Sequence, residues 1–184
     1  MSFWKTSTGD DAAQTATTEY DIGGSIVIPD DSTVLAVVES AMWRKDASFN
    51  EYIELTWAVV RPDEVAKAKV WQKLWVKDAD PRAKDRDAAD KKRDKALRML
   101  ATIDANAGGK LARAGVEPDD DQLTLALTNK PMTIKVKVWE MNGSSGNWIA
   151  AVMPKDRPLE LGKAAPKPSG GTAKPDLGGD EIPF

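Results

Sequence analysis

Stretches in which apolar and polar residues alternate constrain the fold of this 184-residue chain more than any other feature. Successive side chains of a β-strand point to opposite faces, so a period of two predicts strands with one buried face. Alternating or Thr/Val-rich runs cover residues 32–45, 51–61, 69–77, 133–141 and 147–153, and a shorter strand is expected at 25–28. Turn residues separate the runs, as at Asn142–Gly146. The folded part of the chain is therefore predicted to be mainly β.

A helical segment separates the third long strand from the fourth. Asp80-Pro81 has the composition of a helix start, and residues 83–107 are rich in Ala, Lys, Arg and Asp until Gly108-Gly109. Because residues 84–98 are nearly all charged, the first half of this helix is expected to face solvent. A second short helix is expected from Asp119, with Gln122 at its third position. The longer helix has a narrow apolar stripe, formed by Ala96, Leu100, Ile103 and Ala107.

Five strands with a helix between the third and fourth are the plan of an OB-fold, a small Greek-key barrel. We therefore predict an OB-fold-like five-stranded barrel over residues 20–154; a β-sandwich or an α+β sheet with the same element order is the alternative. Residues 1–19 are expected to form a flexible arm. Residues 155–184 are rich in Pro, Gly, Lys and Ala without an apolar period, which predicts a flexible linker ending in an acidic tip.

The residue types that the chain lacks exclude several kinds of chemistry. It contains neither Cys nor His, which excludes disulfides, thiolate and imidazole metal sites, and Ser-His-Asp or Cys-His catalysis. The acidic run Asp119–Asp121 fits a helix N-terminus better than a metal site. We therefore expect no enzymatic activity, no metal and no cofactor. The absence of a long apolar run and of a signal peptide indicates a cytoplasmic protein that contacts no membrane.

The net charge of −3 is unevenly distributed. Residues 1–60 carry 3 basic and 10 acidic side chains, whereas residues 61–115 carry 15 basic and 9 acidic ones. Nucleic-acid binding depends on the local field rather than on the total charge, so this basic middle part permits it.

Lysine and tryptophan alternate on two of the expected strands. The non-aliphatic face of the third strand carries Lys69, Trp71, Lys73, Trp75 and Lys77, and that of the fourth carries Lys135, Lys137 and Trp139. Lysine is rarely buried, which makes these faces unusual as core. Indole rings stack on any base and ammonium groups contact phosphates, so the pattern is typical of single-stranded nucleic-acid binding. Alternatively, the tryptophans seal the outside of a barrel and the lysines are simply solvated.

The remaining tryptophans are interpreted differently. Trp57 shares its face with Ile53, Leu55 and Val59 and is expected in the core. Trp43, Arg44 and Lys45 end the first strand, and Phe49 and Tyr52 follow across a turn. This corner forms either a binding loop or a packed hairpin. The position of Trp148 is ambiguous.

The chain end resembles the acidic tip of bacterial single-stranded DNA-binding proteins. It reads Asp180-Glu181-Ile182-Pro183-Phe184 after a Pro/Gly-rich linker, although only two of its acids are consecutive. In that family, the tip docks on replication and repair proteins. The resemblance implies that Asp176, Asp180, Glu181, Ile182, Pro183 and Phe184 bind a partner protein.

Residues 20–154 resemble instead a family of small phage single-stranded DNA-binding proteins. The resemblance rests on Ile53–Trp57, Val70–Trp75, the charged helix ending at Ala114-Gly115, and Pro131–Val136. It implies a protein that coats and protects single-stranded DNA without sequence preference in phage replication or recombination, within the bacterial host cytoplasm. A replisome adaptor that binds only protein and a divalent-metal nuclease are the alternative functions.

Overall fold

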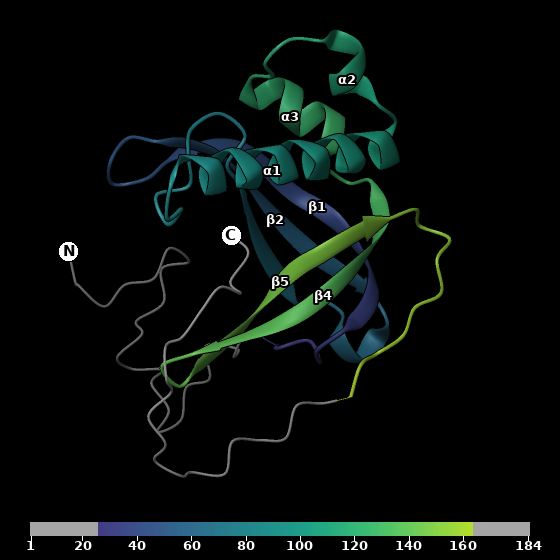
Figure 1. The fold of residues 1–184 in the computed structure, drawn as a ribbon. Helices are drawn as coiled ribbons and strands as arrows, with labels where there is room; N and C mark the ends of the chain where they lie inside the picture. Colours follow the sequence, from purple (N-terminus) through teal and green to yellow (C-terminus); the bar gives the residue numbers. More distant parts are fainter. Residues whose placement is uncertain (1–25, 164–184) are drawn as a thin grey trace, which may run out of the picture.

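The computed structural model describes residues 26–163, which form one five-stranded antiparallel sheet and a group of helices across one end of it (Figure 1). The strand order is β3-β2-β1-β4-β5, and the helices all lie between β3 and β4 in the sequence. The elements are β1 (Ser32–Lys45), β2 (Glu51–Arg61), the 3₁₀ turn η1 (Asp63–Val65), β3 (Lys69–Leu74), α1 (Arg86–Ala107), α2 (Lys110–Ala114), α3 (Asp120–Leu127), β4 (Pro131–Met141) and β5 (Ser144–Met153).

The predicted class and element order are confirmed, with differences at the ends of elements. β1 and β2 have the predicted bounds, whereas β3 ends at Leu74, three residues early. The chain turns there, because the backbone N–H of Val76 donates to the carbonyl of Leu74 at 3.1 Å. The short strand expected at 25–28 is not formed by residues 26–28; instead, the backbone of Ile28 exchanges two 2.8 Å hydrogen bonds with the side chain of Asn147.

The prediction of a closed barrel is wrong, because the sheet is open between β3 and β5. These two edge strands contact each other but form no hydrogen-bonded ladder within the described residues. β3 has only six residues, and side chains of α1 line the gap between the two edges together with β3 and β5. The helix therefore lies beside the gap that strand pairing would close in a barrel.

The core explains a polar residue that interrupts the aliphatic face of β3. Trp57 is completely buried, as predicted, and its Nε1 donates to Oε1 of Gln72 at 3.0 Å. Gln72 lies on the buried face between Val70 and Leu74. A buried donor without a partner costs free energy, so the amide is needed where the indole N–H meets the sheet.

The long helix begins later than predicted and ends where predicted. Asp85, not Asp80, caps α1 by accepting a 2.7 Å hydrogen bond from the backbone N–H of Ala88. Asp80 instead begins a turn in which it accepts from the backbone N–H groups of Arg82 and Ala83. Gly108 has a φ of 113° and ends the helix.

The two shorter helices differ in how well they were predicted. The capping box that begins α3 is confirmed, because the side chains of Asp119 and Gln122 each accept from the other's backbone N–H. The five-residue α2 was not predicted.

Residues 155–163, which the composition assigned to the linker, return to the start of β1. Glu160 and Thr33 exchange backbone hydrogen bonds of 2.7 and 3.0 Å, and Gly162 donates to the hydroxyl of Ser32. A Cβ at Gly162 would collide with the carbonyl oxygen of Asp30, so this close approach requires glycine. The predicted arm at 1–19 and the acidic tip lie outside the described residues. No helix in residues 26–163 is long and apolar enough to cross a membrane.

Candidate nucleic-acid interface

A groove of about 1040 Å³ runs between the two edges of the sheet, with α1 as its third wall. Strand β3 contributes residues 72–74 and the adjoining Trp75, and β5 contributes residues 148–152. Asp30, Lys137 and Val138 complete the wall beside β5. From α1 and the segment before it come Asp80, Lys92, Lys95, Ala96, Arg98, Met99 and Thr102. The gap between the two edge strands is therefore a cavity, whereas in a closed barrel these strands would be hydrogen-bonded to each other.

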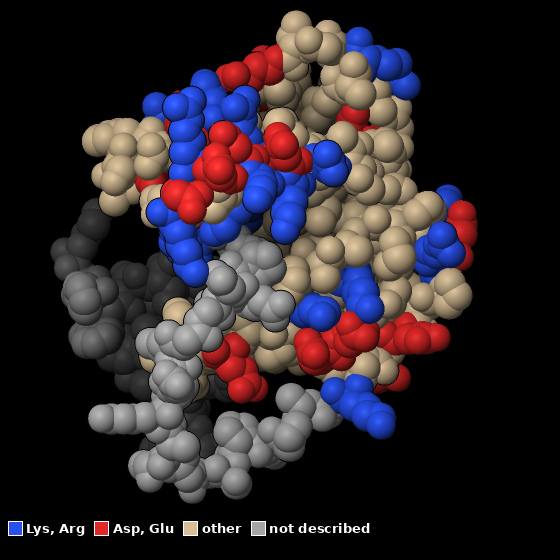
Figure 2. Space-filling view, in the orientation of Figure 1, with Lys and Arg blue, Asp and Glu red and all other residues tan. Residues whose placement is uncertain are grey.

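The basic side chains of the groove are mostly free of acidic partners. Lys73, Lys95, Arg98 and Lys137 line it, and none of them forms an ion pair within residues 26–163. The fifth cation, Lys92, pairs with Asp80 at 3.3 Å. Figure 2 shows Lys and Arg side chains gathered over α1, with acidic side chains among them. The groove therefore brings together, from three separate elements, positive charges that form no ion pair within residues 26–163.

The carboxylate of Asp80 is buried and ties the start of the basic helix to the segment after β3. Its Oδ1 accepts a 2.9 Å hydrogen bond from the backbone N–H of Arg82, and its Oδ2 lies 3.3 Å from Nζ of Lys92. One residue further, Nε of Arg93 donates to the carbonyl of Val76 at 3.1 Å. These contacts hold the basic face of α1 against the groove.

Aromatic rings line the groove beside these cations. Trp75 is only 5% exposed, because the chain turns after Leu74 and places its ring on Tyr52, with the centroids 4.7 Å apart. Its Nε1 has no hydrogen-bond acceptor among the described residues. Nζ of Lys73 lies 4.9 Å above the centroid of the Tyr52 ring, within the range of a cation–π contact. Trp148, whose position the sequence left ambiguous, is half-buried in the opposite wall and pairs with Lys137 in the β4–β5 ladder.

The predicted Lys/Trp face of β3 holds for its first half only. Trp71 is 55% exposed and shares the outer face of the strand with Lys69 and Lys73. Lys69 forms a 2.9 Å ion pair with Glu39, whereas Lys73 reaches the groove. Trp75 leaves this face because it lies beyond the end of the strand. The outer face of β3 is therefore an extension of the groove through Lys73.

The three residues predicted to share a binding face of β4 lie in three different environments. Lys137 lines the groove, whereas Lys135 forms a 2.9 Å ion pair with Asp31. The hydrogen bond from Lys135 lowers the pKa of the Asp31 carboxyl. Trp139 lies across Gly146 in the β4–β5 hairpin, where a Cβ at Gly146 would come within 2.6 Å of its ring. Only one of the three predicted residues thus belongs to the groove.

The structure places Trp43 and Arg44 in a packed hairpin end, outside the groove lining. Nε1 of Trp43 donates to the carbonyl of Pro118 at 2.7 Å, and its backbone N–H donates to Asp120. Arg44 lies 3.4 Å from Glu54 on the neighbouring strand. These contacts join β1 to the start of α3.

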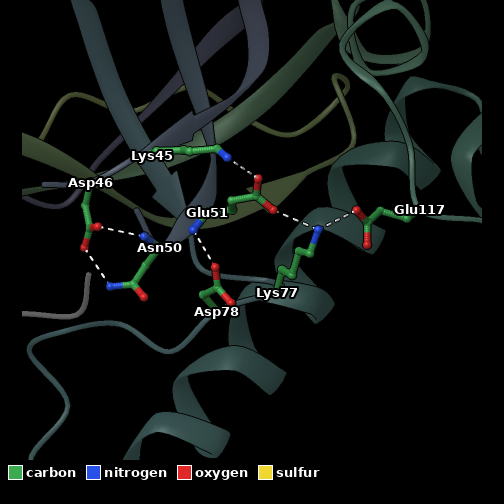
Figure 3. A network of polar contacts seen from close by, with 7 residues as sticks. All are labelled: Lys45, Asp46, Asn50, Glu51, Lys77, Asp78 and Glu117. Carbon is green, nitrogen blue, oxygen red and sulfur yellow. Dashed lines mark hydrogen bonds and ion pairs between the residues drawn. The ribbon is translucent and has the colours of Figure 1, made fainter. Parts of the chain in front are cut away.

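Lys77 belongs to an ion-pair network at the same end of the sheet (Figure 3). Its Nζ lies 2.8 Å from Glu51 and 3.0 Å from Glu117, and Glu51 also pairs with Lys45 at 3.1 Å. These two carboxylates raise the pKa of Lys77, and the hydrogen bond from Lys77 is the main cause of the lowered pKa of Glu51. The charge of Lys77 is therefore compensated by protein groups.

The structure thus brings together three of the predicted residues, Lys73, Trp75 and Lys137, and adds four that the strand pattern did not single out: Lys92, Lys95, Arg98 and Trp148. The three cations on α1 are each three residues apart, a spacing that places them on one helix face and could have indicated a shared surface. The described part of the chain contains no group of three or more acidic residues arranged to hold a metal. No protein-family model and no curated protein matches this chain.

Proposed function

We propose that this protein binds single-stranded DNA without sequence preference in the groove between β3, β5 and α1. The observation that carries the proposal is that Lys73, Lys95, Arg98 and Lys137, which form no ion pair within residues 26–163, line one cavity. Neutralising phosphates with such cations releases condensed counterions, which is the main sequence-independent contribution to affinity.

The aromatic residues favour single strands over duplexes. Bases of a single strand are free to stack on side-chain rings, and such stacking tolerates every base. Trp148 lies in the groove wall, and the exposed ring of Trp71 lies two residues from Lys73 on the outer face of β3. At about 3.3 Å per strand residue, Trp71 and Lys73 are about 7 Å apart along β3, close to the spacing of neighbouring nucleotides.

The groove offers little for reading bases. Among its lining residues the amide side chain is Gln72, which is buried and holds the indole N–H of Trp57. The bidentate amide contact that selects adenine is therefore already used inside the protein. This arrangement favours recognition of the DNA backbone over recognition of sequence.

We also propose that the open sheet is a variant of the OB-fold. The β1-β2-β3 meander and the β4–β5 hairpin joined to β1 through β4 have the connectivity of that fold, apart from the missing β3–β5 ladder. OB-folds bind oligonucleotides across their strands and loops. The opening supports the proposal, because it provides the space in which DNA would lie.

The wider role rests on the resemblances in the sequence. In this proposal, the protein coats single-stranded DNA during phage replication or recombination, and residues 176–184 recruit a partner protein. Phe184 lies close in sequence to the acidic residues Asp180 and Glu181, and a partner pocket that is both apolar and basic would accommodate these groups.

A fluorescence titration with oligo(dT) at two salt concentrations tests the groove. The intrinsic signal comes from seven tryptophans. Removing two groove cations in Lys95→Ala/Arg98→Ala should flatten the plot of log affinity against log salt by about 1.4, since each phosphate contact on a single strand contributes about 0.7. The matched control is Arg44→Ala/Lys69→Ala, which removes two cations that are paired with acids outside the groove.

The outcomes separate the possible functions. A smaller slope for the groove variant than for the control supports the proposal. Equal slopes for the two variants would refute the groove as the binding site. Absence of binding by the intact chain at low salt would refute DNA binding and favour the protein-only adaptor.

A further inference from the structure

We propose that Phe49, at the tip of the β1–β2 hairpin, is a base-stacking residue at one end of the groove. The inference rests on the proposed single-strand binding and adds a residue to it. With 79% of its surface exposed, Phe49 is the most exposed large apolar side chain in residues 26–163. An isolated apolar ring so open to water makes no contribution to the core.

The backbone of Phe49 is in a conformation that its side chain disfavours. Its φ is 64°, in the left-handed region that glycine and asparagine adopt readily and bulky residues rarely do. Residues held in this region cost free energy and cluster at functional sites. A glycine would serve the turn better, so the fold itself gives no reason for phenylalanine.

The loop is nevertheless held rigidly. Oδ1 of Asp46 accepts from the backbone N–H groups of Ser48 and Asn50 at 2.8 and 2.9 Å, and Oδ2 accepts from the Asn50 side chain at 3.0 Å. The backbone N–H of Phe49 itself donates to the carbonyl of Asp46 at 3.1 Å. Figure 3 shows Asp46 and Asn50 beside the ion pairs at the loop base. The ring is therefore presented from a fixed support, which reduces the entropy lost on binding.

The position of the loop connects it to the groove. At the loop base, the backbone N–H of Glu51 donates to Asp78, in the segment that follows Trp75, at 2.6 Å. Tyr52, three residues after Phe49, contacts both Trp75 and Lys73, which line the groove. The hydrogen bond from the Asn50 side chain is the main cause of the lowered pKa of Asp46, and the positive charge of Lys73 adds to it. Phe49 therefore stands just beyond the groove wall formed by Lys73 and Trp75.

The cations that line the groove leading to this end favour a nucleotide as the occupant. A polyanionic strand that follows Lys73 and the unpaired cations of α1 would leave the groove beside the hairpin tip. A base emerging there would meet a ring whose faces are free. An aromatic side chain can stack on any of the bases, which agrees with binding that does not depend on sequence.

The substitution Phe49→Gly makes the test sharp, because it should move stability and affinity in opposite directions. Removing the side chain relieves the left-handed strain, so the melting temperature should rise by a few degrees. The affinity for oligo(dT) should fall by about five- to 100-fold, as for the loss of one stacked base. The salt slope should stay unchanged, because no phosphate contact is removed.

Two further variants complete the design. Phe49→Tyr keeps the ring and should bind oligo(dT) within twofold of the intact chain. Leu125→Ala removes a comparably exposed apolar side chain, 71% exposed on α3 and outside the groove lining, and should leave affinity unchanged.

Failure of this inference can be told apart from failure of the proposed function. If the intact chain binds oligo(dT) and Phe49→Gly binds equally well, Phe49 is not a stacking residue, although the groove still binds DNA. A loss of affinity accompanied by a lower melting temperature would also overturn the inference, because the side chain would then support the fold. If the intact chain does not bind oligo(dT), the proposed function itself is refuted.

Discussion

Two tryptophans four residues apart should respond in opposite ways to replacement by alanine. Trp75 is 5% exposed and stacked on Tyr52, whereas Trp71 is 55% exposed on the outer face of β3. Their alternation in the sequence predicts equal roles, but the end of the strand at Leu74 separates them. Trp75→Ala should therefore destabilise the fold, and Trp71→Ala should weaken DNA binding.

The magnitude for Trp75 follows from its burial. An aromatic side chain that buries about 200 Å² gains about 5 kcal/mol at about 25 cal/mol per Å². The alanine retains part of this gain, and removing an indole N–H that has no acceptor among the described residues returns about 1 kcal/mol. The net loss should be about 3–4 kcal/mol, near the lower end of the range for large aromatic truncations. For a domain of about 150 residues this lowers the melting temperature by about 10 °C.

Trp71 gives the contrasting result. Its ring is largely in water, so truncation should change the free energy of unfolding by less than about 1 kcal/mol. Oligo(dT) affinity should fall by about 1–3 kcal/mol, the contribution of one stacked base. Thermal melts paired with fluorescence titrations measure both quantities on the same samples. A large fall in melting temperature for Trp71→Ala, or none for Trp75→Ala, would refute the assignment of these two side chains.

Two further predictions concern the fold. Gln72→Leu should lower the free energy of unfolding by about 1–3 kcal/mol, measured by urea denaturation, because Nε1 of Trp57 loses its buried acceptor. Glu51→Gln should be less stable than the intact chain at pH 7, with the difference shrinking at pH 3. The reason is that hydrogen bonds from Lys77 and Lys45 hold the folded-state pKa of Glu51 below its ordinary value of 4.5, so its contribution is present above that value and is lost as the pH falls through the folded pKa. A pH-independent difference would contradict this account.

Local patterns in the sequence predict the elements well. The Thr/Val-rich run and the period of two locate β1 and β2, respectively, to the residue, and the capping residues locate the start of α3 at Asp119–Gln122. Buried side chains and orphan N–H groups impose these patterns within a few residues, so no distant contact is needed to see them. Among the exceptions is the end of β3 at Leu74, where the Lys/Trp alternation continues although the strand has stopped.

The groove depends on contacts that no local pattern encodes. Alternation tells which face of a strand a residue occupies, but not which two edges of a twisted sheet approach each other. Lys73 on β3 and Lys137 on β4 are separated in the sheet by β2 and β1. They line one cavity because the two edge strands, β3 and β5, approach each other beside α1. Trp148 could not be assigned for the same reason: its importance comes from β5 being the second edge.

Pairing between charges is the other property that composition hides, and it decides which lysines remain available for phosphate. Lys73 and Lys77 have the same spacing from tryptophan and the same predicted face. Lys77 lies between Glu51 and Glu117, whereas Lys73 lies over an aromatic ring and faces the groove. A phosphate at Lys77 would have to compete with two carboxylates, whereas Lys73 forms no ion pair within residues 26–163. The site is therefore defined less by where lysines occur than by where the fold leaves them without an acid.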